Sequence, residues 1–158
     1  MASSKGEEEE SERLNRNFGE LLQELRVAQT GTQILLAFLL TIAFSTRFAN
    51  LSDWSIHIYT AAVCLAAIAM ALLVAPVATH RMVFRRQLKE ELVLVSHWMT
   101  VSGLVFLFFA VVASVLLVLQ VAMGDTVGAW LAAAIATIFV CAWGVLPAVM
   151  RLKGSLPS

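Results

Sequence analysis

Hydrophobic residues in this chain gather in four long runs separated by short polar connections. A helix needs about 20 consecutive apolar residues to cross the hydrocarbon core of a bilayer, and each run is long enough. The runs are continuously apolar and rich in Ala, Leu and Val, without the alternation that marks the strands of a membrane β-barrel. The pattern therefore predicts four transmembrane helices, at residues 27–46, 56–79, 99–121 and 127–150.

The segment before the first run divides into two parts. Residues 1–10 are small, polar and acidic, which predicts a disordered tail. In residues 11–26, apolar side chains recur at helical spacing at Leu14, Phe18, Leu21 and Leu25, which predicts an amphipathic helix. Residues 151–158 form a short polar tail. The predicted fold class is all-α, an integral membrane four-helix bundle with an N-terminal amphipathic cytoplasmic helix.

Composition supports a membrane protein and excludes an ordinary soluble domain. The 158 residues are 59% hydrophobic and only 14% charged, with a mean hydropathy of +0.82; soluble domains are roughly half apolar and a quarter charged. Of the 11 Lys and Arg residues, every one except Arg47 lies on the side of the predicted membrane that holds the two termini. The positive-inside rule then predicts cytoplasmic N- and C-termini in a multi-pass protein of the cell (plasma) membrane.

Small residues and turn residues predict how the helices meet. Alanines recur at spacing four in two rows along the second run, at Ala62 and Ala66 and at Ala67, Ala71 and Ala75. Such rows allow close contact between membrane helices. Gly124 and Gly128 straddle the connection between the last two runs, so we expect both in a turn. Ser52 precedes the second run and is expected to cap that helix.

Four polar residues near the cytoplasmic side of the predicted spans are candidates for a functional site. Gln29 and Gln33 lie one turn apart in the first run, His80 ends the second, and His97 precedes the third. Polar side chains are costly in hydrocarbon and tend to face the bundle interior, where these four would line a polar pocket. The alternative for the Gln pair is interhelical hydrogen bonding without a ligand. No carboxylate or second His is spaced to complete a metal or haem site, so we expect no metal and no cofactor.

Charged residues outside the spans give a second set of candidates. Glu20 and Glu24 of the amphipathic segment are placed to form ion pairs with Arg85 and Arg86 of the connection between the second and third runs. The alternative is that these arginines set the topology and contact lipid headgroups. Arg47, on the opposite side, is expected to extend to the headgroups or to pair with Asp53.

Several short motifs carry a resemblance to a known family. In order, they are Glu24-Leu25-Arg26-Val27, Gly31, Gln33, Ala37-Phe38-Leu39-Leu40, Phe44, Arg47-Phe48, Ala75-Pro76-Val77-Ala78, His80-Arg81 and Phe84-Arg85-Arg86. In these residues the chain resembles an uncharacterised family of small four-span membrane proteins found mainly in actinobacteria. Some members of that family carry a sodium/proton antiporter label. No Asp or Glu lies within the predicted spans, so this chain lacks the intramembrane carboxylate that proton and cation exchangers use.

These observations rank the functions without deciding between them. The chain contains no nucleophile elbow, phosphate loop, metal-binding helix motif or facing carboxylate pair, so we expect no enzymatic activity. The leading hypothesis is a scaffold or accessory subunit whose surroundings are the lipid bilayer and whose partner is a second copy or another membrane protein. The alternative is a cation/proton transporter or channel component that uses the inner polar residues. We expect no nucleic-acid binding.

Overall fold

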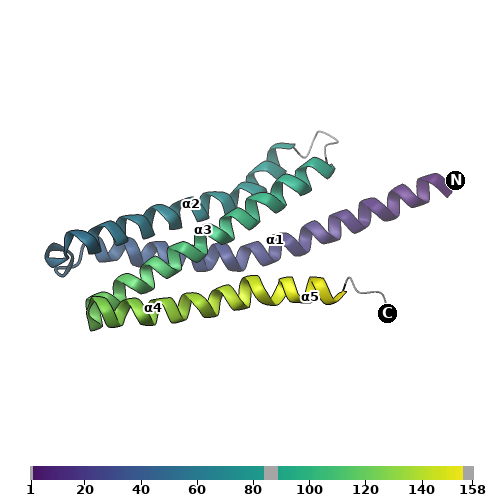
Figure 1. Cartoon of the computed structure of the whole chain (residues 1–158). Coiled ribbons are helices and arrows are strands. Elements are labelled where there is room, and N and C mark those ends of the chain that lie inside the picture. The colour runs from purple at the N-terminus through teal and green to yellow at the C-terminus, as the bar shows by residue number, and fades with distance from the viewer. Residues whose placement is uncertain (1, 84–88, 155–158) are drawn as a thin grey trace. The chain divides into compact units, whose positions relative to one another are not determined.

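The computed structural model describes residues 2–83 and 89–154, with side chains described at residues 16, 19, 23, 25–78 and 94–150. The described backbone is helical almost throughout and contains no strand (Figure 1). The long helices are α1 (Ala2–Ala43), α2 (Asp53–Val83), α3 (Lys89–Met123) and α4 (Asp125–Val140). A 3-10 turn, η1 (Phe48–Asn50), lies between α1 and α2, and a π turn, η2 (Cys141–Val145), leads from α4 into α5 (Leu146–Gly154). The predicted all-α class is confirmed.

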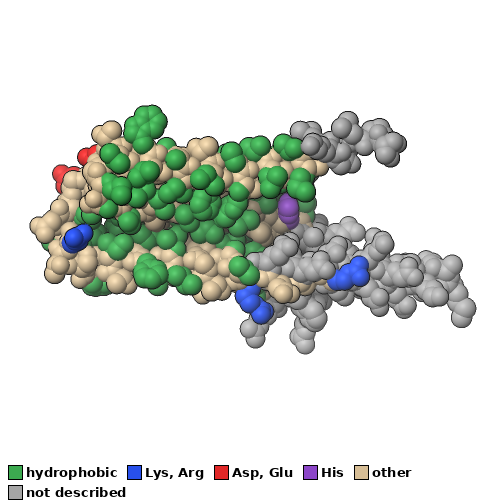
Figure 2. All heavy atoms as spheres, turned by 90° about the horizontal axis from the view of Figure 1, so that it is seen from below, with side chains coloured by type: hydrophobic (Ala, Val, Ile, Leu, Met, Phe, Trp, Pro, Cys, Tyr) green, Lys and Arg blue, Asp and Glu red, His purple; other side chains and the backbone are tan. Residues whose placement is uncertain are grey.

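In the described part of the chain, four helical segments are long and apolar enough to cross a membrane. They are Leu25–Ala43, Asp53–Ala78, Leu94–Met123 and Asp125–Met150. Each overlaps one predicted run, with ends shifted by a few residues. In hydrocarbon every backbone N–H and C=O must be bonded internally, and a continuous helix does this within a single segment. The chain is therefore a multi-pass membrane protein. Figure 2 shows that hydrophobic side chains cover much of the described surface on this face, where charged side chains are few.

The N-terminal region differs from the prediction of a separate tail and helix. α1 begins at Ala2 and continues without interruption into the first span, so residues 2–10 are helical where a disordered tail was expected. The acidic composition of this segment argues against a packed core, but Glu, Lys and Ala are strong helix formers. Extending an existing helix needs no new nucleus, which removes the main cost of forming those turns.

The chain divides into two compact units, each of which is described by itself. The first consists of Met1–Phe38 and Ala66–Leu107. Within it, α1 is joined to α2 by a hydrogen bond, and α3 lies close to α2 at Gly103. A Cβ added to Gly103 would lie 2.9 Å from Cγ of Leu73, so a larger residue there would have to displace the Leu73 side chain. Leu73 is fully buried at this contact.

The second unit consists of Leu39–Leu65 and Phe108–Ser158. The buried Tyr59 of α2 donates a hydrogen bond from its hydroxyl to the carbonyl oxygen of Leu39 in α1, at 3.0 Å. Its ring also packs edge-to-face on Phe48, with 5.0 Å between the ring centroids. Phe108 of α3 meets Phe139 of α4, with centroids 6.3 Å apart. Aromatic and hydrogen-bonding contacts therefore connect neighbouring helices in this unit.

The connections between helices agree in part with the turn predictions. The backbone N–H of Ser55 donates to Oγ of Ser52 at 3.2 Å, which confirms Ser52 as the N-cap of α2. Gly124 has a φ of 86°, a conformation that favours glycine, and forms the turn between α3 and α4. The turn prediction for Gly128 is wrong, because this residue is buried inside α4. A Cβ there would lie 2.6 Å from the backbone nitrogen of Gln120, so Gly128 is what lets α4 approach α3.

The π turn of the last span has a cause in the sequence. Pro147 follows η2 and has no N–H to donate to the carbonyl four residues earlier. The preceding N–H, that of Leu146, bonds to the carbonyl oxygen of Cys141, five residues back. The helix thus accommodates a proline within a segment that is apolar enough to span the membrane by widening one turn.

Candidate functional site

The first of the four candidate polar residues, Gln29, joins α1 to α2. Its side-chain Nε2 donates a hydrogen bond of 2.7 Å to the backbone carbonyl oxygen of Leu73. This carbonyl lies three residues before Pro76, which is fully buried inside α2. Proline removes one hydrogen bond of the helix ladder and crowds the preceding turn. The carbonyl that loses its partner is that of Leu72, four residues before Pro76. Gln29 adds a bond to the next carbonyl of the same turn, that of Leu73.

Gln33, one turn further along α1, has a different environment. Its side chain is exposed, and the structure records no hydrogen bond to it from the described residues. It lies eight residues after the start of the span Leu25–Ala43 and ten before its end, near mid-membrane depth. Thr30 and Ala37, on the same side of α1, are also exposed. Gln33 is thus an exposed amide within a transmembrane segment.

The two histidines do not complete a pocket with the glutamines in the described part of the chain. His97 is exposed on α3 and lies edge-to-face with Trp98, the ring centroids 6.2 Å apart. The side chain of His80 lies outside the described residues. Among the described side chains, no contact connects Gln29 with Gln33 or His97, so the polar pocket stays a prediction. The interhelical hydrogen bonding foreseen for the Gln pair is found for Gln29.

The candidate ion pairs fall where the structure gives no side chains. Glu20, Glu24, Arg85 and Arg86 all lie outside the residues whose side chains are described. Their pairing therefore stays a prediction. Within the described segments, no three His, Cys, Asp or Glu side chains group as metal ligands.

Two buried polar atoms were not singled out by the sequence pattern. Ser96 is 1% exposed, and its Oγ has no hydrogen-bond partner among the described residues. Oε1 of Gln120 is likewise buried without a partner. A lone Ser in an apolar run usually bonds to the carbonyl of the preceding turn, as Ser114 does to Ala110 at 2.7 Å. The sequence offers no signal that separates Ser96 from Ser114.

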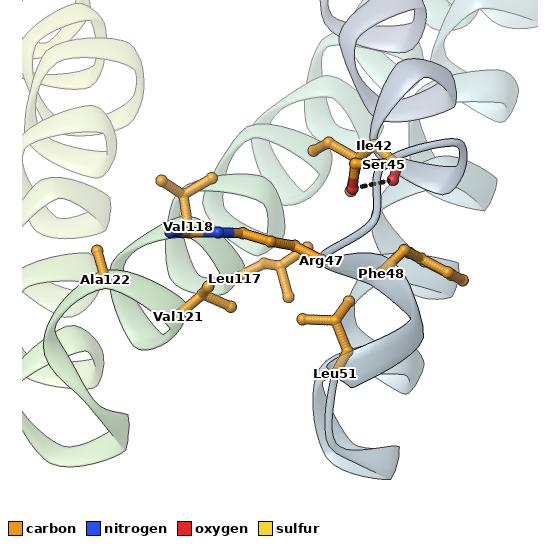
Figure 3. Close-up of a pocket in the computed structure, with 9 residues that line it drawn as sticks. All are labelled: Ile42, Ser45, Arg47, Phe48, Leu51, Leu117, Val118, Val121 and Ala122. Carbon is orange, nitrogen blue, oxygen red and sulfur yellow. Dashed lines mark hydrogen bonds between the residues drawn. The ribbon is translucent and has the colours of Figure 1, made fainter.

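A pocket of about 240 Å³ opens beside the α1–α2 connection in the second unit. On one side it is lined by the end of α1 and the connection, through Ile42, Ser45, Arg47, Phe48 and Leu51. On the other side the last turns of α3 form a wall of Leu117, Val118, Val121 and Ala122. Figure 3 shows the Arg47 side chain extending from the connection across the pocket to Val118.

Of the two predictions made for Arg47, pairing with Asp53 is not found. Asp53 is described, yet the structure records no ion pair between Arg47 and any described carboxylate. The hydroxyl of Ser45 donates to the carbonyl oxygen of Ile42 at 2.7 Å and is the other polar side chain of the pocket (Figure 3). The pocket thus combines one charged group with an almost wholly apolar lining.

Comparison with known proteins places the chain in a family. Residues 7–147 match the model of a family of unknown function, DUF6328. The chain belongs to the DUF6328 family. This confirms the resemblance to an uncharacterised family, and the match includes all four membrane-spanning helices for most of their length. No curated protein matches the chain, and no solved structure matches it.

Proposed function

We propose that this DUF6328 protein is a non-enzymatic scaffold or accessory subunit that binds a transmembrane helix of a second copy or of another membrane protein. The observation that carries the proposal is the exposed amide of Gln33 within the span Leu25–Ala43. Lipid tails offer no hydrogen-bond partner. Leaving an amide without a partner in hydrocarbon costs on the order of several kcal/mol, which is the cost of transferring an amide from water to alkane. A partner helix that bonds to Gln33 removes this cost.

The surroundings of Gln33 suit a close helix contact. Thr30 and Ala37 lie about one turn before and after it and are small, which lets a second backbone approach. Interhelical contacts of this kind in membranes depend on small residues together with a polar side chain that bonds across the interface. α1 provides both on one face.

The last span supports the same conclusion from a second direction. Only 6% of the window Asp125–Met150 is buried, compared with 28% for Asp53–Ala78 and 22% for Leu94–Met123. The fourth span therefore keeps most of its surface for lipid or for a partner helix. By contrast, Gln29, one of the inner polar residues that a transport pathway would use, already bonds to Leu73.

The test measures association in lipid rather than in detergent. Donor- and acceptor-labelled copies are reconstituted into liposomes at increasing lipid dilution, and energy transfer gives the dissociation constant. A photo-cross-linking residue at position 37 reports any other membrane protein that binds this face in native membranes. Gln33→Leu should weaken association or cross-linking about three- to twentyfold, from the strength of hydrogen bonds between membrane helices.

Two controls make the result specific. Gln33→Asn keeps the amide and should retain most of the association, while Ile34→Leu changes a neighbouring exposed apolar residue, 53% exposed, and should change nothing. Association and cross-linking that are identical in wild type and Gln33→Leu would refute the proposal. Proton or cation flux in proteoliposomes that is lost in a Gln33→Leu, His97→Leu variant would replace it with the transporter alternative.

A further inference from the structure

The pocket beside Arg47 has the features of a site for an amphiphilic anion. A guanidinium group extends across a cavity whose other walls are apolar (Figure 3). We infer that this pocket binds one glycerophospholipid, whose phosphate bonds to Arg47 and whose acyl chain lies on the α3 wall. The inference does not depend on the proposed function, because Gln33 takes no part in it.

Charge complementarity identifies the phosphate. Arginine stays charged at any physiological pH, and its planar N–H groups match the paired oxygens of a phosphate. The structure records no described carboxylate paired with Arg47. Asp53 and Asp125 lie in the first turns of α2 and α4, are exposed, and do not line the pocket. A free anion would satisfy the charge but would leave the apolar wall uncovered.

The wall accounts for the acyl chain. Leu117 is buried at the base of the wall, while Val118 is 56% and Val121 44% exposed. The pocket, at about 240 Å³, is smaller than the roughly 300–1,000 Å³ that hold a whole drug-sized ligand. Its size fits one segment of a chain rather than an entire lipid, with the remainder of the lipid in the bilayer.

The position along the helices agrees with a lipid occupant. The span of α1 ends at Ala43 and that of α3 at Met123, so the pocket lies at the boundary of the hydrocarbon region. Phosphate groups of a bilayer lie just outside this boundary and acyl chains just inside it. Basic pockets between transmembrane helices bind lipid headgroups in the same way.

The experiment uses the full chain in detergent micelles with phosphatidylglycerol that carries a photoactivatable group on one acyl chain. Cross-linked peptides are mapped by mass spectrometry, and the yield on residues 117–122 is followed as the lipid is titrated. We expect saturable cross-linking there, with an apparent affinity that falls at least about tenfold in Arg47→Gln and less in Arg47→Lys. Val118→Trp fills the groove and should abolish the saturable cross-linking. Val105→Trp, at an exposed site elsewhere on α3, should leave the cross-linking unchanged.

Lipid probes distinguish the two halves of the site. A photoactivatable diacylglycerol, which lacks the phosphate, should label residues 117–122 weakly and without saturation. Glycerol 3-phosphate, which lacks the acyl chains, should not displace phosphatidylglycerol. Equal labelling by both lipids, displacement by glycerol 3-phosphate, or unchanged labelling in Arg47→Gln would each overturn the inference. Unchanged helical circular dichroism in the Arg47 variants shows that any loss of labelling is not a loss of fold.

Discussion

The hydrogen bond from Gln29 to the Leu73 carbonyl should matter because Pro76 lies in the same turn of α2. If the bond compensates for the proline, its value depends on the proline being present. Replacing Pro76 by Ala restores an N–H at position 76 and relieves the crowding of the preceding turn. The new N–H bonds to the carbonyl of Leu72, and without the proline ring the turn can straighten, so the carbonyl of Leu73 bonds better to the N–H of Val77 and gains less from Gln29. A double-mutant cycle with Gln29→Leu and Pro76→Ala measures this dependence.

The magnitude follows from the location of the bond. It has a donor–acceptor distance of 2.7 Å and joins a half-buried amide to a backbone carbonyl within the membrane-spanning region. Hydrogen bonds between membrane helices contribute about 0.6 kcal/mol on average and up to about 1.7 kcal/mol. The short distance and the proline place this bond in the upper part of that range, so Gln29→Leu should lower the free energy of unfolding by about 1–1.7 kcal/mol.

Unfolding is followed by far-ultraviolet circular dichroism as sodium dodecyl sulfate is added to protein in mild detergent, and the free energies are compared within the cycle. In the Pro76→Ala background Gln29→Leu should cost less by at least about 0.5 kcal/mol, which is the coupling energy. Thr60→Val is the control, because it removes a side-chain hydrogen bond that stays within α2, from Thr60 to the carbonyl of Ile56. A zero coupling energy, or an equal loss from Thr60→Val, would refute the argument.

Three further predictions concern contacts inside the second unit and at the helix ends, each measured by the same unfolding titration. Gly128→Ala should destabilise the protein by about 1–3 kcal/mol or more, because the new Cβ meets the α3 backbone; Gly31→Ala, where nothing lies within 4 Å, should be neutral or stabilising. Tyr59→Phe should cost about 1 kcal/mol through loss of the buried hydroxyl bond to Leu39, and no change would show that the Phe48 contact suffices. Ser52→Ala should cost about 1 kcal/mol by removing the N-cap of α2, whereas Ser52→Asn should retain the cap and serves as its control.

Gln29 and Gln33 show a difference in environment that the sequence does not predict. Gln29 and Gln33 are four positions apart and were treated as one pair, since such positions share a helix face. The structure separates them, with Gln29 bonded to α2 and Gln33 exposed. Four residues advance a helix by slightly more than one turn, so of two residues on one face, one can contact the neighbouring helix while the other lies just outside the contact. Only the position of the neighbouring helix decides on which side each one falls.

The alanine rows of α2 make the same point. Both rows have the spacing that permits close packing, yet Ala62 and Ala66 are fully buried while Ala67 and Ala71 are exposed. Lipid tails are as apolar as a helix surface, so hydrophobicity does not mark the side that faces the protein. In a soluble helix the polar face would have made that distinction, and here it is absent.

Hydropathy along the chain determined the four spans and the all-α class, because crossing hydrocarbon depends on the length and composition of each segment and on bonding within it. Local rules also determined the Ser52 cap and the Gly124 turn, which involve only residues near one another in the chain. Tertiary structure alone decided that Gly128 is a contact, that Gln29 bonds to the turn before Pro76, and that Arg47 extends over the wall of α3. Each of these depends on a contact with another helix, whose side and depth the local pattern does not specify.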